Sequence, residues 1–283
     1  MAALHPRRRR SDLRAAIPFL LPGFLGLATF LILPLFASLL LSFSNWQVIG
    51  QTRFVGLANY VNLFTRDPIF WGVFRTTLLY TVEYLALNLV ISLVIAVWIG
   101  SLSWGQQLFR LVFFLPTFTP LIGISLVWLL MLTPGGIVDG VFATLGAPVP
   151  NLITSPAYAL QVVVIVSLWS HFGYNMLLFG AALESIPSAY LDAAAIDGAR
   201  PWQRFWRIKL PLISPSLFFG TVLTTISSLQ VFDQVYALTR GGPGSSTTTL
   251  GYASAIAWVL FAVIMALTAL QLRLQRRWVH YDI

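Results

Sequence analysis

The chain has 283 residues, 58% of them hydrophobic and only 9% charged, and its mean hydropathy is +0.82; an ordinary soluble domain, which carries about 25% charged residues, is therefore excluded. The formal net charge is +8, but the arginines lie in short runs between long apolar stretches and form no continuous basic face, so no nucleic acid is expected as a partner. The chain has no cysteine, which excludes disulfides, thiolate catalysis and cysteine-ligated metals.

Long apolar runs predict membrane-crossing helices, because a helix needs about 20 apolar residues to span a bilayer. The first run follows four arginines at 7–10 and is longer than the apolar part of a signal peptide, so an uncleaved first helix is expected. We predict an all-α membrane protein whose six-helix bundle comprises Ile17–Phe43, Val73–Ile99, Phe109–Leu132, Ala159–Leu183, Ile213–Leu238 and Gly251–Leu272. Pro116, Pro120 and Gly123 are expected to kink the third span.

The distribution of Lys and Arg predicts the orientation of these spans. With the N-terminus in the cytoplasm, thirteen of these residues fall on the cytoplasmic side and four on the other side, as the positive-inside rule requires. Both termini are therefore expected inside. The predicted organisation is a basic cytoplasmic N-terminus (1–16), a six-helix transmembrane domain (17–272) that includes a cytoplasmic loop (184–215), and a cytoplasmic tail (273–283).

The loop 184–215 predicts two short helices. Pro187 suits a first helical turn, Gly198 suits a C-terminal cap, and Pro201 can open a second helix that Pro211 ends. The first helix is rich in alanine, so another protein could approach its backbone closely. The second mixes aromatic and basic residues, as interfacial helices do: Trp202, Arg204, Phe205, Trp206, Arg207, Ile208 and Lys209. From periodicity alone, docking on a protein and resting on the inner leaflet explain the loop equally well.

Residues 192–199 read Asp-Ala-Ala-Ala-Ile-Asp-Gly-Ala, and Phe205 and Leu210-Pro211 follow. This pattern resembles the coupling loop of binding-protein-dependent ABC importer permeases, in particular the sugar and glycerol-phosphate (maltose-type) branch. Asp192 stands where that family usually has Glu, which shortens the reach of the carboxylate. In the family the loop forms a short helix that docks on the ATPase subunit. The resemblance implies these coupling residues: Asp192, Ala193, Ala194, Asp197, Gly198, Ala199 and Arg204.

Other segments are similar to the same branch: 54–60, Leu115-Pro116, 232–236, 241–244 and 246–250. One departure concerns an external loop. Family members usually carry an additional aromatic and polar stretch before a Gly-Tyr-Ala-Ser-Ala segment, whereas here Leu250 runs directly into Gly251. A natural deletion and residues missing from the sequence both explain this. The resemblance implies the fold of type I ABC importer permeases, in a multi-pass protein of the bacterial inner (cell) membrane.

The chain is not expected to be an enzyme or to hydrolyse ATP. A phosphate-binding P-loop needs Gly-Lys followed by Ser or Thr, but the only lysine, Lys209, is followed by Leu210. No cofactor or metal site is expected in the chain, and His171 has no second ligand three or four residues away. The resemblance implies ATP and Mg on two ATP-binding partner subunits. It also implies a second homologous permease subunit, as a heterodimer, an extracytoplasmic solute-binding protein, and membrane lipid as surroundings.

Polar side chains within the predicted spans mark a candidate substrate path, because such residues are costly in lipid and usually face the bundle interior or a water-filled route. Amides, hydroxyls and aromatic faces suit a hydroxyl-rich solute. The alternative is that these groups only join helices through hydrogen bonds, and a structural hydrogen bond is the expectation for Glu83. The candidates are Glu83, Asn88, Trp169, His171, Tyr174, Asn175, Ser228, Gln230 and Asp233.

We therefore expect the transmembrane subunit of an ATP-driven ABC importer that carries a sugar or related polyol by alternating access. The main alternative is a proton-coupled secondary transporter that uses Glu83, His171 and Asp233 as a relay. A membrane-embedded hydrolase is disfavoured, because no nucleophile–base constellation is visible. Sugars, oligosaccharides and glycerol-phosphate esters all stay open as solutes, and the scarcity of Lys and Arg within the spans favours a neutral sugar.

Overall fold

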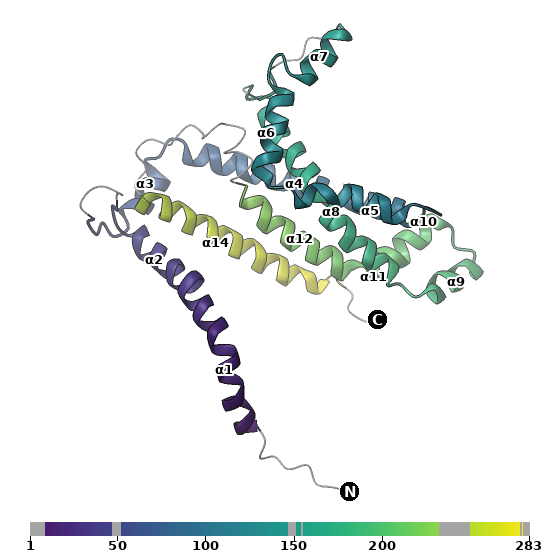
Figure 1. Ribbon diagram of the computed structural model, residues 1–283, viewed down its shortest axis with the longest axis horizontal. Helices are drawn as coiled ribbons and strands as arrows, with labels where there is room; N and C mark the ends of the chain where they lie inside the picture. Colours follow the sequence, from purple (N-terminus) through teal and green to yellow (C-terminus); the bar gives the residue numbers. More distant parts are fainter. Residues whose placement is uncertain are drawn as a thin grey trace. The chain divides into compact units, whose positions relative to one another are not determined.

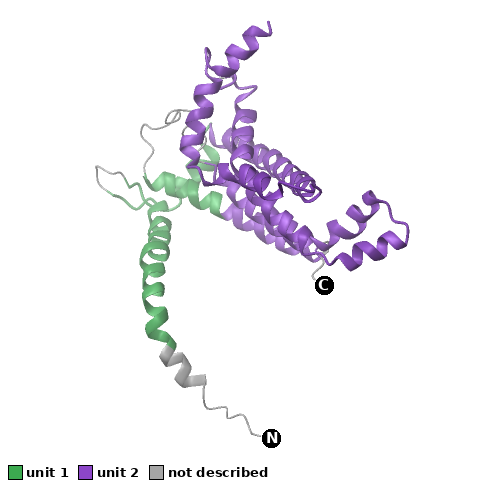
Figure 2. Ribbon diagram, turned by 45° about the vertical axis from the view of Figure 1, so that its right-hand side comes forward, with its two compact units in different colours: residues 1–68, 246–261 green, residues 69–245, 262–283 purple. Residues whose placement is uncertain are grey.

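The computed structural model of the chain (Figure 1) describes residues 9–46, 52–146, 151–153, 155–231, 250–277 and 279. Within these ranges the chain is helical and has no strand, only one isolated antiparallel bridge between Ser44 and Phe54. It divides into two compact units (Figure 2): residues 1–68 with 246–261, and residues 69–245 with 262–283. The predicted all-α class is confirmed.

Five helical stretches are long and apolar enough to cross a membrane: Ala16–Ser42, Phe70–Gly100, Leu121–Thr144, Ala159–Glu184 and Leu250–Leu274. A sixth candidate is a bent pair in which Pro201–Leu212 and Ser214–Leu229 meet at 66°. Four predicted spans coincide with these stretches to within a few residues. The fifth predicted span starts as expected, but its end at Leu238 lies outside the described residues.

The third predicted span is interrupted rather than kinked. Helix α5 (Gln106–Phe114) passes into the short 3-10 helix η2 (Leu115–Phe118), the backbone is extended at Thr119, and α6 (Leu121–Leu132) then begins. Proline has no N–H to donate to the preceding turn, so Pro116 and Pro120 end the hydrogen-bond ladder here. The kink predicted within 109–132 is therefore a full break at Pro116 and Pro120, while Gly123, also predicted to contribute, lies inside α6 with no irregularity.

The first unit contains α1 (Arg9–Leu27), the π-helical turn η1 (Ala28–Ile32), α2 (Leu33–Ser42), α3 (Ala58–Thr65) and the first half of α14 (Leu250–Leu274). Its elements join around buried Asn59, whose Nδ2 donates to the carbonyl oxygens of Ser42 at 2.8 Å and Ser44 at 3.0 Å. Gly251 fits against the same Ser44 carbonyl, where any Cβ would collide. The end of the first span is therefore held by Asn59 of the 54–60 motif on its carbonyl groups and packs directly against the start of the last span at Gly251.

The second unit is built on α4 (Phe70–Gly100), α8 (Ala159–Glu184) and α12 (Ser214–Leu229), with α5, η2, α6, α7 (Ile137–Thr144), the second half of α14 and η4 (Gln275–Arg277) around them. Small residues bring the helices close together, as is common in membranes. Ser92 of α4 donates to the carbonyl of Phe172 at 2.8 Å. Gly173 of α8 meets the backbone of α5, since a Cβ there would lie 2.4 Å from the Phe113 carbonyl oxygen.

The predicted helical hairpin follows α8. It consists of α9 (Ser188–Ile196), α10 (Pro201–Arg204), the π-helical turn η3 (Phe205–Lys209) and α11 (Leu210–Leu212). Gly198, in the turn between the two arms, has a φ of 76°, a left-handed conformation that suits glycine. Helix α9 projects from the end of the packed helices of the second unit (Figure 1). The positions of both short helices agree with the sequence prediction.

Candidate functional site

A polar junction joins α4, α8 and α12 in the interior of the second unit. The Nδ2 of Asn175 donates to Asn88 Oδ1 at 2.6 Å and to Thr224 Oγ1 at 2.8 Å. Asn88 in turn donates to the Tyr84 hydroxyl at 3.4 Å. All four side chains are buried, and a buried amide in a membrane protein must find its partners within the protein. The junction thus connects three helices through a single amide group.

The close approach of α12 to α8 depends on Gly220. A Cβ at this position would lie 3.0 Å from the ring of Phe179 and 3.1 Å from Asn175 Oδ1. This Oδ1 atom is buried and has no hydrogen-bond partner among the described residues. A buried acceptor without a donor is costly, so the Asn175 amide is one place where a rearrangement of the helices, or a ligand, can improve the bonding.

A cavity of about 340 Å³ lies beside this junction. Its volume falls in the range of small-molecule sites. The polar and aromatic side chains along it can donate, accept and stack, as a hydroxyl-rich solute requires. Its lining is drawn from α4, η2, α8 and the α12 segment: Tyr84, Asn88, Thr117, His171, Tyr174, Asn175, Leu223, Thr224, Ile226, Ser227 and Gln230.

Five predicted path residues line this cavity: Asn88, His171, Tyr174, Asn175 and Gln230. Asn88 and Asn175 fit both alternatives for polar residues in the spans, the substrate path and the interhelical hydrogen bond. Both residues line the cavity, and they also bond α8 to α4. His171 is half-buried, and its Nδ1 lies 3.3 Å from the Ser167 carbonyl oxygen. Among the described residues, no three His, Asp or Glu side chains gather as a metal site would need.

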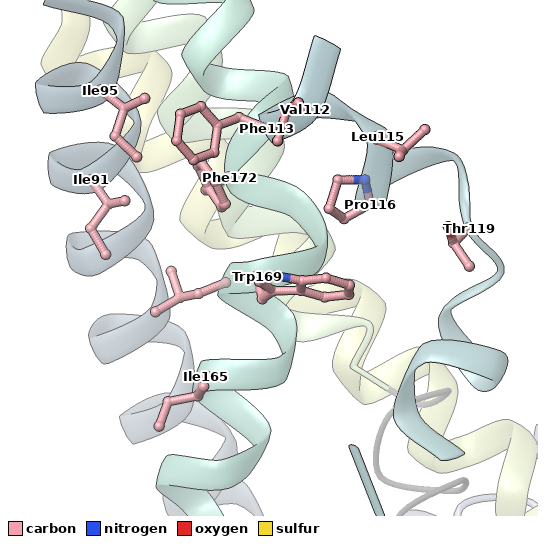
Figure 3. A pocket seen from close by; sticks show the side chains of 11 residues that line it. Ile91, Ile95, Val112, Phe113, Leu115, Pro116, Thr119, Ile165, Trp169 and Phe172 are labelled. Atoms are coloured by element: carbon pink, nitrogen blue, oxygen red, sulfur yellow. The ribbon is translucent and has the colours of Figure 1, made fainter. Parts of the chain in front are cut away.

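Trp169 lines a different cavity, of about 650 Å³, and packs edge-to-face on Trp128 at 6.0 Å. This cavity is almost wholly apolar and lies between α4, α8 and the broken helix at η2 (Figure 3). Figure 3 shows the Trp169 indole pointing from α8 toward Pro116 and Thr119. Trp169 and its neighbours thus line an apolar cavity. They do not line the 340 Å³ cavity beside the Asn175 junction, here called the polar cavity.

Two further predicted residues, Ser228 and Glu83, do not line the polar cavity. Ser228 is buried, and its hydroxyl donates to the Thr225 carbonyl of the same helix at 2.9 Å. Asp233 lies outside the described residues. Glu83 is half-buried on α4 and forms no hydrogen bond or ion pair with any described residue, so the structural hydrogen bond expected for it is absent from this part of the chain.

Helical geometry explains the position of Glu83. Tyr80 and Tyr84 are four residues apart, stack with centroids 5.5 Å apart, and face α8, where Tyr80 donates to Ser167 at 2.9 Å. Successive residues of a helix are about 100° apart, so Glu83 lies about 60° from Tyr80 and about 100° from Tyr84, at the flank of the face that the two tyrosines share. By residue type, Glu83 resembles its polar neighbours on α4. In the structure, however, it is the tyrosines and Asn88 that bond or pack toward the interior of the second unit.

Sequence reasoning missed Thr224, Thr117 and Gly220. Thr117 lies in η2 and donates to the Ser170 carbonyl at 3.1 Å. Thr224 precedes Ser228 by four residues, so the helical period could have added it to the stripe that includes Ser228. Thr224 accepts a hydrogen bond from Asn175 of another helix. The hydroxyls of Thr221 and Thr225 instead donate to carbonyl groups of α12 itself. Nothing in the sequence alone distinguishes Gly220 from the other glycines within the spans.

Six of the seven predicted coupling residues lie on or just after α9. Asp192, Ala193, Asp197 and Gly198 are exposed, and the neighbouring Ile196 has 87% of its surface free; Ala194 and Ala199 are half-exposed. Arg204 lies apart from this group in α10, where its Nε is buried and unbonded among the described residues. The exposed members all lie between residues 192 and 198, and Arg204 is not part of this group.

An ion pair anchors the base of the hairpin. Arg110 of α5 donates to the carboxylate of Glu184, the last residue of α8 before the hairpin. Both side chains are partly exposed, so the pair adds little to stability. It links α5, which leads to the break at η2, to the point where α8 passes into the hairpin.

Comparison with known proteins identifies the protein family of the chain. The family model described as "Binding-protein-dependent transport system inner membrane component" matches residues 88–279, which include the hairpin and, apart from Tyr84, the residues of the polar junction. The chain belongs to this family. It is therefore a multi-pass component of the inner membrane, as the resemblance of residues 192–199 implied.

The curated relatives are permease proteins. The chain is 32% identical to the probable ABC transporter permease protein YesP of Bacillus subtilis, over 98% of this chain and 95% of the relative. It is 30% identical to the lactose transport system permease protein LacF of Rhizobium radiobacter, over 89% and 91%. It is 32% identical to the sn-glycerol-3-phosphate transport system permease protein UgpA of Yersinia pestis, over 94% and 96%.

The fold is similar to that of a bacterial alginate ABC transporter, crystallised in complex with an alginate pentasaccharide-bound periplasmic protein. The TM-score is 0.80 at 19% identity, over 98% of this chain and 100% of that chain. A second structure, of a bacterial ABC transporter for import of alginate, gives 0.77 at 21% identity, over 94% and 99%. At these identities the likeness concerns the fold.

Proposed function

We propose that this chain is the membrane-spanning subunit through which an ATP-driven importer passes a sugar or a related polyol. The single observation that carries this is the family match over residues 88–279, which includes the hairpin and every described lining residue of the cavity except Tyr84. Relatives named for lactose and for sn-glycerol-3-phosphate support the solute class. The polar cavity supports it independently, since amides, hydroxyls and aromatic rings suit a solute rich in hydroxyl groups.

In this proposal, helix α9 docks on an ATP-binding subunit. Its small residues leave the backbone accessible, and Ile196 offers an apolar contact that no described residue covers. Asp192, Asp197 and Gly198 complete the docking surface. ATP and Mg belong to two such subunits, and ATP binding moves α9. Because α9 follows α8 directly, that movement reaches the helix that carries His171 and Asn175.

A second, homologous permease subunit and a solute-binding protein complete the proposed importer. The structural neighbour crystallised with a substrate-loaded periplasmic protein supports a partner of that kind. Alternating access then means that the helices around the Asn175 junction rearrange to expose the cavity to one side of the membrane at a time. A neutral solute fits best, because no Lys or Arg lines the cavity among the described residues.

Uptake into proteoliposomes tests the energy source. Vesicles holding this chain, its permease and ATP-binding partners, and the loaded binding protein should take up solute when ATP is enclosed, with no loss on addition of a protonophore. Uptake that persists without the ATP-binding subunit and collapses with the protonophore would instead support the proton-coupled transporter. That alternative has little support, since Glu83 does not line the cavity that His171 lines.

The role of α9 is tested by a pair of strain-matched variants. Gly198 and Gly135 both have left-handed backbones, with φ of 76° and 80°, and a Cβ on either meets no atom within 4 Å. Gly198→Val should abolish ATP-dependent uptake while the protein stays inserted, because it distorts the docking turn. Gly135→Val, with similar strain in another loop, should retain uptake. Equal uptake by the two variants contradicts docking through α9.

A further inference from the structure

The second arm of the hairpin differs in charge from the first. Helix α9 and its turn, residues 188–198, contain two Asp and no Lys or Arg. Residues 200–212, here called the basic elbow, contain four cations and no acidic residue: Arg200, Arg204, Arg207 and Lys209. No acidic residue follows until beyond Val231. The two arms are therefore suited to different partners.

The cations of the basic elbow are free of ion pairs in the part of the chain that the structure describes. None of the four forms an ion pair with any residue that the structure describes. Beside them, Trp202 and Trp206 pack edge-to-face at 5.2 Å, with 69% and 48% of their surfaces exposed. Exposed tryptophans next to unpaired cations are typical of a surface that lies at the level of lipid headgroups.

The direction of the basic elbow fits a membrane surface. The segment Pro201–Leu212 meets Ser214–Leu229 at 66°. Spanning helices tilt by about 20° from the bilayer normal on average, so a segment bent this far from its span runs closer to the membrane plane than to the normal. The bend follows Pro211 and precedes Pro215, which both lack the N–H needed to continue a straight ladder.

We propose that the basic elbow binds the headgroups of anionic phospholipids, with its cations on the phosphates and with Trp202 and Trp206 in the interfacial layer. The acidic α9 would be repelled by the same surface and stays free for a protein. Periodicity left two explanations for the hairpin, docking on a protein and resting on the inner leaflet. The first then applies to α9 and the second to the basic elbow. This inference does not depend on what the protein transports.

Lipid retention by the full chain tests the proposal. The chain is placed in nanodiscs that contain equal amounts of phosphatidylglycerol and phosphatidylcholine, and native mass spectrometry measures the ratio of the two lipids retained after release. The parent chain should retain phosphatidylglycerol preferentially. Arg207→Gln/Lys209→Gln should reduce that preference by about 10- to 30-fold, because each cation near a membrane surface contributes about 1 kcal/mol.

A charge-matched control is Arg53→Gln/Arg66→Gln, at two exposed positions of the other unit, which should leave the preference unchanged. Trp202→Ala/Trp206→Ala should lower retention of both lipids alike. Inorganic phosphate should not displace the lipid at equal concentration. Size-exclusion elution at the parent's volume verifies that each variant is folded.

Two results would overturn the proposal. The parent chain could show no preference for phosphatidylglycerol, or Arg207→Gln/Lys209→Gln could retain the preference in full. In the second case, loss of co-purification with the ATP-binding subunit would make the basic elbow a protein-docking surface. Because the lipid assay needs no transport, its failure is distinguishable from failure of the proposed import function.

Discussion

At the scale of single residues, Asn175 has the most consequential position. One side chain on α8 bonds to α4 through Asn88 and to α12 through Thr224, so any relative movement of these helices must break or exchange those bonds. Interhelical hydrogen bonds in membranes are individually modest. Such bonds can hold a defined arrangement without locking it, which suits a protein that must alternate between two states.

Substitution of Thr224 tests the junction. Thr224→Val keeps the shape of the side chain but removes the acceptor for Asn175, and should lower the free energy of unfolding by about 0.6–1.7 kcal/mol. Thr221→Val is the matched control, since the Thr221 hydroxyl bonds only to the Leu217 carbonyl of its own helix. The thermal midpoints of the two detergent-solubilised variants provide the comparison. If Thr221→Val is as destabilised as Thr224→Val, the interhelical hydrogen bond from Asn175 to Thr224 does not stabilise the protein more than a hydrogen bond within one helix.

At the scale of helices and loops, glycine sets the distance between α8 and α5. The backbone of α5 at Phe113 and Phe114 lies directly over Gly173, and no rotamer change can move a carbonyl oxygen away. The packing therefore fixes α5 on α8 just before the break at η2. The Arg110–Glu184 ion pair holds the same two helices near the hairpin.

Gly173→Ala should destabilise the second unit strongly, because its Cβ would lie 2.4 Å from the Phe113 carbonyl oxygen and 2.9 Å from the Phe114 Cα. Overpacking of this kind typically costs about 1–3 kcal/mol. Gly180→Ala on the same helix meets no atom within 4 Å and should be neutral, or stabilising by up to about 1 kcal/mol through helix propensity. Thermal midpoints again provide the measurement, and a Gly173→Ala variant as stable as Gly180→Ala would contradict the close contact.

At the scale of the whole molecule, the orientation in the membrane stays a prediction, based on the thirteen-to-four division of Lys and Arg. The absence of cysteine makes it easy to test. Ile196 and Phe54 have 87% and 81% of their surfaces exposed, so a single cysteine at either position would be reactive. The orientation predicts that they lie on opposite sides of the membrane.

In intact spheroplasts, an impermeant maleimide should label Phe54→Cys directly and Ile196→Cys only after permeabilisation. The chain is expressed alone, so that no ATP-binding subunit covers α9. Labelling of Ile196→Cys in intact cells would reverse the orientation and would also remove the basis for docking on a cytoplasmic ATPase.

Length comparison bears on the external loop before Gly251. The match to YesP runs over 294 positions, more than this chain contains, although it covers 98% of the chain. The relative therefore carries residues that this chain lacks. The motif residues 232–249 lie outside the described part of the chain, so a deletion at Leu250 stays a prediction.

The sequence predicted the spans well because a long apolar run has few other ways to satisfy its backbone. It also located the hairpin, through proline and glycine positions that act locally. It failed where three-dimensional neighbours decide. Trp169 lines an apolar cavity, although His171 two residues later lines the polar cavity. Which face of α8 meets which helix depends on contacts such as those of Gly173, and no local pattern encodes them.

The interruption after η2 has a mechanical consequence. Among the described residues, the last main-chain bond before it runs from Thr119 N to Pro116 O, and the next runs from Ile124 N to Pro120 O, so none crosses from one side to the other. Thr119 precedes Pro120, which restricts its backbone to the extended conformation that it has here, with φ of −83° and ψ of 134°. Thr119 and Pro116 also line the 650 Å³ apolar cavity. The two prolines thus set a fixed corner in the wall of that cavity, where torsional restriction takes the place of main-chain hydrogen bonds.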